Sequence, residues 1–241
     1  MTPDFTSIWV YLSTSPLLWL TATLLAYQFA LGLHARAKAS PLVNPVMIAV
    51  VILVTLLALT NTPYRNYFEG AQFVHFLLGP ATVALAIPLY QQLAKLRRHW
   101  FAFLAGTLVG STAAVAAAMG IAWLLGASPA VVLSLAPKSV TTPIAMGIAE
   151  KIGGLPSLTA VMVIVTGIVG ASLAQFFMRI IKIRDDSICG FAMGVTAHGL
   201  GTARAFQVSA EMGAFAGLAM GMTGVLTAVL LPLALKLFGV I

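Results

Sequence analysis

Two short polar stretches stand out in a sequence that is otherwise mostly apolar. The first reads SLAPKSVTTPIAM, from Ser134 to Met146, and the second reads GVTAHGLGTARAF, from Gly194 to Phe206. Each places cationic or titratable side chains beside hydroxyls and beside Pro or Gly, the residues that interrupt helices. Positive charge, hydroxyl donors and the free N–H groups at a helix start all stabilise a carboxylate. The stretches therefore predict a site for a small anion.

The first stretch offers one positive charge next to several hydroxyl donors. At bilayer depth a lysine costs about 2.5–3.5 kcal/mol, so it is tolerated only where protein buries it or a watery cavity receives it. A half-helix beginning near Pro143 adds free backbone N–H groups. The alternative is that Lys138 snorkels and the hydroxyls only repair broken helix bonds. The candidate residues are Lys138, Ser139, Thr141, Thr142 and Pro143.

The second stretch combines a histidine, two glycines and an arginine. Arg204 can bind a carboxylate by donating two parallel hydrogen bonds. His198 can donate to an anion or exchange a proton near neutral pH, and the glycines permit sharp turns or close approach. The alternative pairs Arg204 with Glu211 and makes His198 a cap for a helix break. The candidate residues are His198, Gly199, Gly201, Thr202 and Arg204.

The composition places both stretches inside a membrane. Of the 241 residues, 60% are hydrophobic and only 8% are charged, whereas soluble domains carry about 25% charged residues. The alternating segments of about ten residues that mark a transmembrane barrel are missing, so we expect an all-α polytopic membrane protein. No paired acids, nucleophile set, metal-ligand spacing or phosphate-binding loop is recognisable. We therefore expect no enzyme, no cofactor and no metal.

About six apolar segments are long enough for spanning helices. Basic clusters at 34–38, 95–98 and 179–184 all belong on the cytoplasmic side by the positive-inside rule. The predicted spans are 17–33, 42–60, 71–93, 101–125, 155–178 and 213–238.

The clusters at 95–98 and 179–184 are both expected on the cytoplasmic side, and the fourth span carries the chain from the first of them to the outside. Only one net crossing is then available to bring the chain back to 179–184. Two apolar segments lie there, so one of them must not cross. We predict that 128–150 is a re-entrant hairpin from outside and that 188–208 is a second one from the cytoplasm. The alternative makes each a broken helix that does cross, which leaves 179–184 outside against the rule.

Internal similarity supports this organisation. A shift of 60 residues aligns Lys138 with His198, and a small slip aligns the Thr-Gly pair at 166–167 with that at 223–224. Each unit is one hairpin plus one crossing, which is an inverted repeat of the kind that holds a transport site near the midplane. Chance matching in a low-complexity sequence is the alternative. The repeat units are 128–186 and 187–241, within one membrane domain covering 1–241.

Three motifs resemble the LrgB/CidB family of membrane proteins, which includes the LrgB-like half of the plastidial glycolate/glycerate translocator. They are YRNYFEGAQFVHFLLGPATVALAIPLY at 64–90, LAPKSVTTPIAM at 135–146 and GVTAHGLGTARAF at 194–206. The resemblance implies two functions of different classes. One is transport of small carboxylates such as glycolate, glycerate or pyruvate. The other is a holin- or antiholin-like role that modulates murein hydrolase export and cell lysis.

The resemblance also implies a separate partner, a small membrane protein of the LrgA/CidA type, and a homo- or hetero-oligomer in the lipid bilayer. The first residues lack a signal peptide's basic start and a transit sequence, so we expect a multi-pass protein of the bacterial cytoplasmic (inner) membrane. Two interrupted polar stretches suit a selective anion site better than a large hole. The expected function is therefore secondary transport of small carboxylates, proton-coupled through His198, with the holin- or antiholin-like role as the alternative. We expect Lys138→Ala or Arg204→Ala to abolish uptake.

Overall fold

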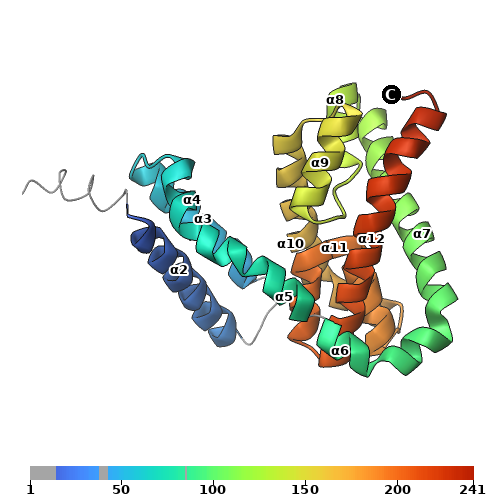
Figure 1. The fold of residues 1–241 in the computed structure, drawn as a ribbon, viewed down its shortest axis with the longest axis horizontal. Helices are drawn as coiled ribbons and strands as arrows, with labels where there is room; N and C mark the ends of the chain where they lie inside the picture. The colour runs from blue at the N-terminus through green and yellow to red at the C-terminus, as the bar shows by residue number, and fades with distance from the viewer. Residues whose placement is uncertain (1–14, 38–42, 85) are drawn as a thin grey trace, which may run out of the picture. The chain divides into compact units, whose positions relative to one another are not determined.

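The computed structural model describes residues 15–37, 43–84 and 86–241, and every regular element among them is an α-helix. The chain divides into an N-terminal unit, 1–84, and a C-terminal unit, 85–241 (Figure 1). The expected absence of a leader concerns residues 1–14, which lie outside the described residues. So do Lys38 of the first basic cluster and Leu42 at the start of the second predicted span.

The N-terminal unit packs three of its helices through small and aromatic residues. Trp19 is fully buried and its ring meets that of Tyr67 edge-on, with centroids 6.0 Å apart. Gly70 allows α4 to approach α2, because a Cβ there would lie 2.2 Å from the carbonyl oxygen of Pro16. The helices are α2 (Pro16–Arg36), α3 (Pro45–Leu59), α4 (Tyr64–Phe76) and α5 (Leu78–Ala84).

The C-terminal unit contains the two polar stretches. The first stretch covers the end of α8, the link that follows and the first half of α9, and the second stretch lies within α11. The helices are α6 (Ala86–Gln91), α7 (Leu93–Leu124), α8 (Pro129–Leu135), α9 (Thr142–Ile152), α10 (Pro156–Ile180), α11 (Asp186–Phe206) and α12 (Ala210–Leu237).

Four helices, α2, α7, α10 and α12, are long and apolar enough to cross a membrane. The apolar α3 has 15 residues and extends about 22 Å at 1.5 Å per residue, less than a bilayer core of about 30 Å. The third predicted span, 71–93, is not one helix, because its residues are shared among α4 to α7. The polytopic all-α class is confirmed, but the described helices offer four clear spans where about six were predicted.

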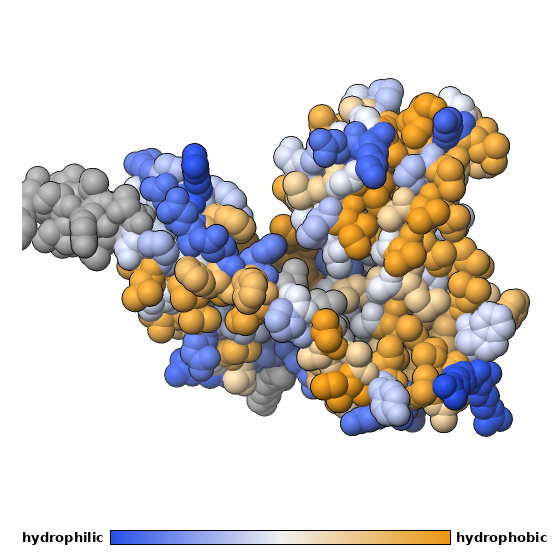
Figure 2. All heavy atoms as spheres, in the orientation of Figure 1, coloured by the Kyte–Doolittle hydropathy of each residue, from blue (hydrophilic) through white to orange (hydrophobic). Residues whose placement is uncertain are grey.

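The ends of the C-terminal unit show its topology. At one end Lys95 Nζ lies 3.3 Å from Asp185 and 2.8 Å from Glu211, which joins the starts of α7, α11 and α12. The clusters at 95–98 and 179–184 therefore share one side, as the positive-inside rule predicts. On the face shown in Figure 2, hydrophobic side chains cover the middle of this unit and hydrophilic ones gather toward its two ends.

Helices α11 and α12 pack with their backbones in close contact. A Cβ on Gly190 would lie 2.0 Å from the carbonyl oxygen of Met212, and one on Gly194 would lie 2.1 Å from that of Ala216. Glycine at these positions is what allows the approach, as is common between membrane helices. This packing fixes α11, the helix that carries the second polar stretch.

Candidate functional site: two helical hairpins

The first polar stretch forms a hairpin whose two ends meet. The backbone N–H of Leu155 donates to Ser134 Oγ at 2.7 Å, and Thr159 Oγ1 donates to the carbonyl oxygen of Ser134 at 2.9 Å. Ser134 is fully buried, so these bonds hold the end of α8 against the start of α10. The chain thus leaves this point at Ser134 and returns to it at Leu155, which confirms the predicted hairpin.

Residues 136–141, here called the first tip, connect α8 to α9 without forming a helix. Thr141 has extended backbone angles at the N-cap of α9, and its side chain does not cap the helix. The first N–H groups of α9 therefore face a position where an anion is favoured. Lys138 is half-buried and its Nζ lies 3.5 Å from Ser139 Oγ, while Pro143, in the first turn, is exposed.

The second polar stretch is also a hairpin. His198 interrupts α11 with φ 40° and ψ −130°, and the chain reverses there. As a result a Cβ on Gly201 would lie 2.7 Å from the carbonyl oxygen of Met193, eight residues earlier. Ser209 Oγ donates to Asp186 Oδ2 at 2.6 Å, so the two ends of the hairpin meet. The predicted hairpin shape is found here too; its entry from the cytoplasmic side stays a prediction.

The turn of this second tip, residues 197–199, differs from the prediction in one respect. The residue in the left-handed region is His198, whereas Gly199 has no positive φ, and a Cβ built on it would meet only Met220 Sδ, at an ordinary contact distance of 3.9 Å. Gly201 does have the close approach that was predicted. A non-glycine with positive φ persists only when surrounding contacts hold it.

Those contacts come from α10 and from the hairpin itself. The His198 ring is buried, and its Nε2 lies 2.9 Å from the carbonyl oxygen of Val163. Because that oxygen can only accept, Nε2 carries the proton in this arrangement. Gly167 leaves room for the ring, since a Cβ there would lie 2.7 Å from His198 Cε1. Thr202 Oγ1 donates to the His198 carbonyl oxygen at 2.9 Å, which repairs a helix bond at the break.

Arg204 lies away from the second tip. It is half-buried in the last turn of α11, and its Nη1 donates to Gln207 Oε1 at 2.8 Å. Six residues of helix place it about 9 Å from His198 along the axis. Glu211, its alternative partner in the sequence, accepts from Lys95 at 2.8 Å. The structure therefore brings His198 to the tip and keeps Arg204 near the hairpin's base.

The two tips come together inside the C-terminal unit. Val163 of α10 links them, because its carbonyl oxygen lies 2.9 Å from His198 Nε2 of the second tip and its side chain packs in the same buried cluster as Val140 of the first tip. Helix α12 contacts both hairpins, because Thr202 Oγ1 lies 3.8 Å from Met220 Sδ and a Cβ on Gly224 would lie 3.1 Å from Ile144 Cδ1. A positive charge, an uncapped helix start and a buried imidazole are thus assembled between α10 and α12.

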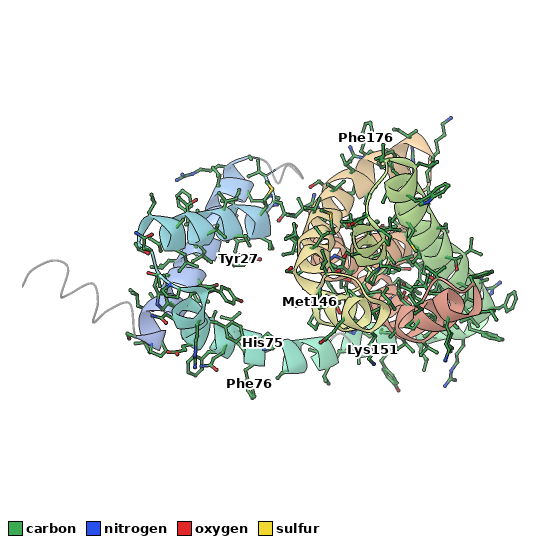
Figure 3. The ribbon with its side chains drawn as sticks, turned by 90° about the horizontal axis from the view of Figure 1, so that it is seen from above. Tyr27, His75, Phe76, Met146, Lys151 and Phe176 are labelled. Atoms are coloured by element: carbon green, nitrogen blue, oxygen red, sulfur yellow. The ribbon has the colours of Figure 1, made fainter. Side chains whose placement is uncertain are left out.

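The outer side of α9 carries residues that do not belong to this site. Met146 and Lys151 are both exposed (Figure 3). Sequence reasoning missed Ser134 and Thr159, which fasten the first hairpin, and Thr223, which is buried in α12. For Thr223 the available signal was the matching Thr-Gly pair of the repeat.

The fold and site define a polytopic helical membrane protein with two helical hairpins. The chain matches the model of the LrgB-like family over residues 23–237 and belongs to that family. It is similar to proteins named antiholin-like protein LrgB from Bacillus mycoides, Bacillus cereus and Bacillus anthracis. Each is 32% identical over 225 residues, which cover 93% of this chain and 98% of the relative. No solved structure matches the chain.

Proposed function

We propose that this chain is an antiholin-like protein of the bacterial cytoplasmic membrane that modulates murein hydrolase export and cell lysis. The observation that carries this proposal is the similarity, over 93% of the chain, to relatives that are named antiholin-like. In this proposal the chain acts by associating with other helices inside the bilayer. Exposed apolar side chains on the long helices, such as Val109 on α7 and Val229 on α12, suit such contacts. The proposed partner is a small membrane protein of the LrgA/CidA type.

The test is a lysis assay in a bacterial host that expresses the LrgA-type partner with or without this chain. Murein hydrolase activity in the medium and the rate of detergent-induced lysis are measured, and membrane insertion is checked in each strain. We expect the chain to change both quantities only when the partner is present. Equal lysis and equal hydrolase release in all strains would contradict the antiholin-like role.

A second candidate function is secondary transport of small carboxylates such as glycolate, glycerate or pyruvate, with a proton carried by His198. The observation that favours it is the meeting of two interrupted segments at Val163 of α10, which lies 2.9 Å from His198 Nε2 through its carbonyl oxygen and packs in the same buried cluster as Val140 of the first tip. Irregular backbone and charge at membrane depth are tolerated where they line a site, and paired broken segments are typical of transporters. A protein that only restrains a pore needs neither feature.

Uptake of labelled glycolate and pyruvate into liposomes tests this candidate, with and without the LrgA-type partner and under an imposed pH gradient. We expect saturable uptake that responds to the gradient and that Lys138→Ala abolishes. The matched control is Lys151→Ala, because Lys151 has the same charge in the same hairpin but is exposed on α9. Since Arg204 lies near the hairpin's base, Arg204→Ala should lower uptake less than Lys138→Ala. Release of large dyes without saturable uptake would refute transport and indicate a pore.

A further inference from the structure

A buried hydroxyl in the middle of α12 has no hydrogen-bond partner. Thr223 is 1% exposed, and its Oγ1 finds no donor or acceptor among the described residues. Threonines in helices commonly donate to the carbonyl four residues earlier, as Thr107 does to Phe103 at 2.8 Å. A buried hydroxyl without a partner costs free energy, so this one calls for a partner outside the protein atoms, such as a bound water or a ligand.

Thr223 lies on the stretch of α12 that faces both hairpins. One turn before it, Met220 Sδ lies 3.8 Å from the Thr202 hydroxyl oxygen of the second hairpin. At the next position, Gly224 meets Ile144 of the first hairpin. Positions 220, 223 and 224 share one face of a helix, because residues three and four apart are neighbours. The unpaired hydroxyl therefore lies between the contacts that α12 makes with the second hairpin and with the first.

We propose that the Thr223 hydroxyl donates a hydrogen bond to a carboxylate oxygen of a small anion held between the two hairpin tips. The anion is the partner that fits this hydroxyl, because Lys138 and the uncapped start of α9 make the surroundings positive. The two hairpin tips then form two sides of the site, and Thr223 on the spanning helix α12 forms the third. This inference rests on the carboxylate candidate of the preceding subsection.

The test compares Thr223→Val, which keeps the shape and removes the hydroxyl, with Thr223→Ser, which keeps the hydroxyl. The matched control is Thr107→Val, which removes a fully buried hydroxyl that is already bonded within α7. The purified full chain is used for two readouts, the KM of glycolate uptake in liposomes and the rise in unfolding temperature caused by glycolate in detergent.

We expect Thr223→Val to raise the KM for glycolate about tenfold or more, the loss typical of one hydrogen bond to a charged group, and to abolish most of the glycolate-induced temperature rise. Thr223→Ser should stay close to wild type in both. Without ligand, Thr223→Val should unfold at or above the wild-type temperature because no internal bond is lost, whereas Thr107→Val should unfold lower and keep its KM.

The outcomes separate the two proposals. A wild-type chain with neither saturable uptake nor a glycolate-dependent temperature rise would refute the carboxylate candidate and this inference with it. A functional wild type together with an unchanged KM in Thr223→Val would overturn only the role of Thr223. A lower unfolding temperature of Thr223→Val without ligand would also overturn it, because it would show that the hydroxyl has an internal structural partner.

Discussion

The close packing of α11 on α12 makes Gly194→Ala a sharp test of the structure. The new Cβ would lie 2.1 Å from the carbonyl oxygen of Ala216 and 2.8 Å from the Ala219 side chain. Even a weak C–H···O contact needs about 3.3 Å, so the two backbones must separate by about 1 Å. Overpacking of this kind costs about 3 kcal/mol, and the better helix propensity of Ala returns about 1 kcal/mol. We expect a net loss of about 2 kcal/mol.

The assay is thermal unfolding of the purified chain in detergent, followed by tryptophan fluorescence. For a chain of this size about 2 kcal/mol lowers the unfolding temperature by about 4–8 °C. The matched control is Gly221→Ala in the same α12, where a Cβ meets nothing within 4 Å and only the propensity gain remains, so stability should rise. If Gly194→Ala unfolds at or above the wild-type temperature, α11 and α12 do not approach each other as described.

Two further predictions concern the base of each hairpin. Ser134→Ala leaves the backbone N–H of Leu155 without its acceptor, which should cost about 1–3 kcal/mol and lower the unfolding temperature, whereas an unchanged temperature would show that the first hairpin is fastened elsewhere. The pKa of Asp185 is lowered to about 2 by hydrogen bonds from Ser187 and the backbone and by Lys95. A lowered folded-state pKa contributes stability above about pH 4 that is lost as the pH falls toward 2, so the unfolding temperature should fall through that window less steeply in Asp185→Asn than in wild type.

The hairpins could be predicted from the sequence because the lipid hydrocarbon tolerates very little non-helical backbone and very few charged side chains. Unwound backbone and Lys138 cannot face hydrocarbon, so the first polar stretch had to be inside the protein. The basic clusters then fixed which segments cross and which return. The ion pair of Lys95 with Asp185 and the bond from Ser209 to Asp186 agree with that reasoning.

Other features could not be predicted because tertiary contacts decide them. The apolar composition of 71–93 suggested a span, but this segment is divided among several short helices and the start of α7. Pro80 and Pro88 lie in that segment, and each removes a backbone donor that a continuous helix needs. Glycine was the expected turn residue of the second tip, yet His198 takes the left-handed conformation because Val163 and Gly167 of α10 hold its ring.

The Thr-Gly pairs aligned by the repeat have comparable places in the structure. Gly167, on the long helix α10 that follows the first hairpin, gives room to His198 of the second hairpin. Gly224, on the long helix α12 that follows the second hairpin, meets Ile144 of the first. Each long helix therefore contacts the hairpin of the other unit in addition to packing against that of its own. The repeat itself stays a prediction, but this exchange means that α10 and α12 each touch both hairpins, so the two sides of the site share the same two supporting helices.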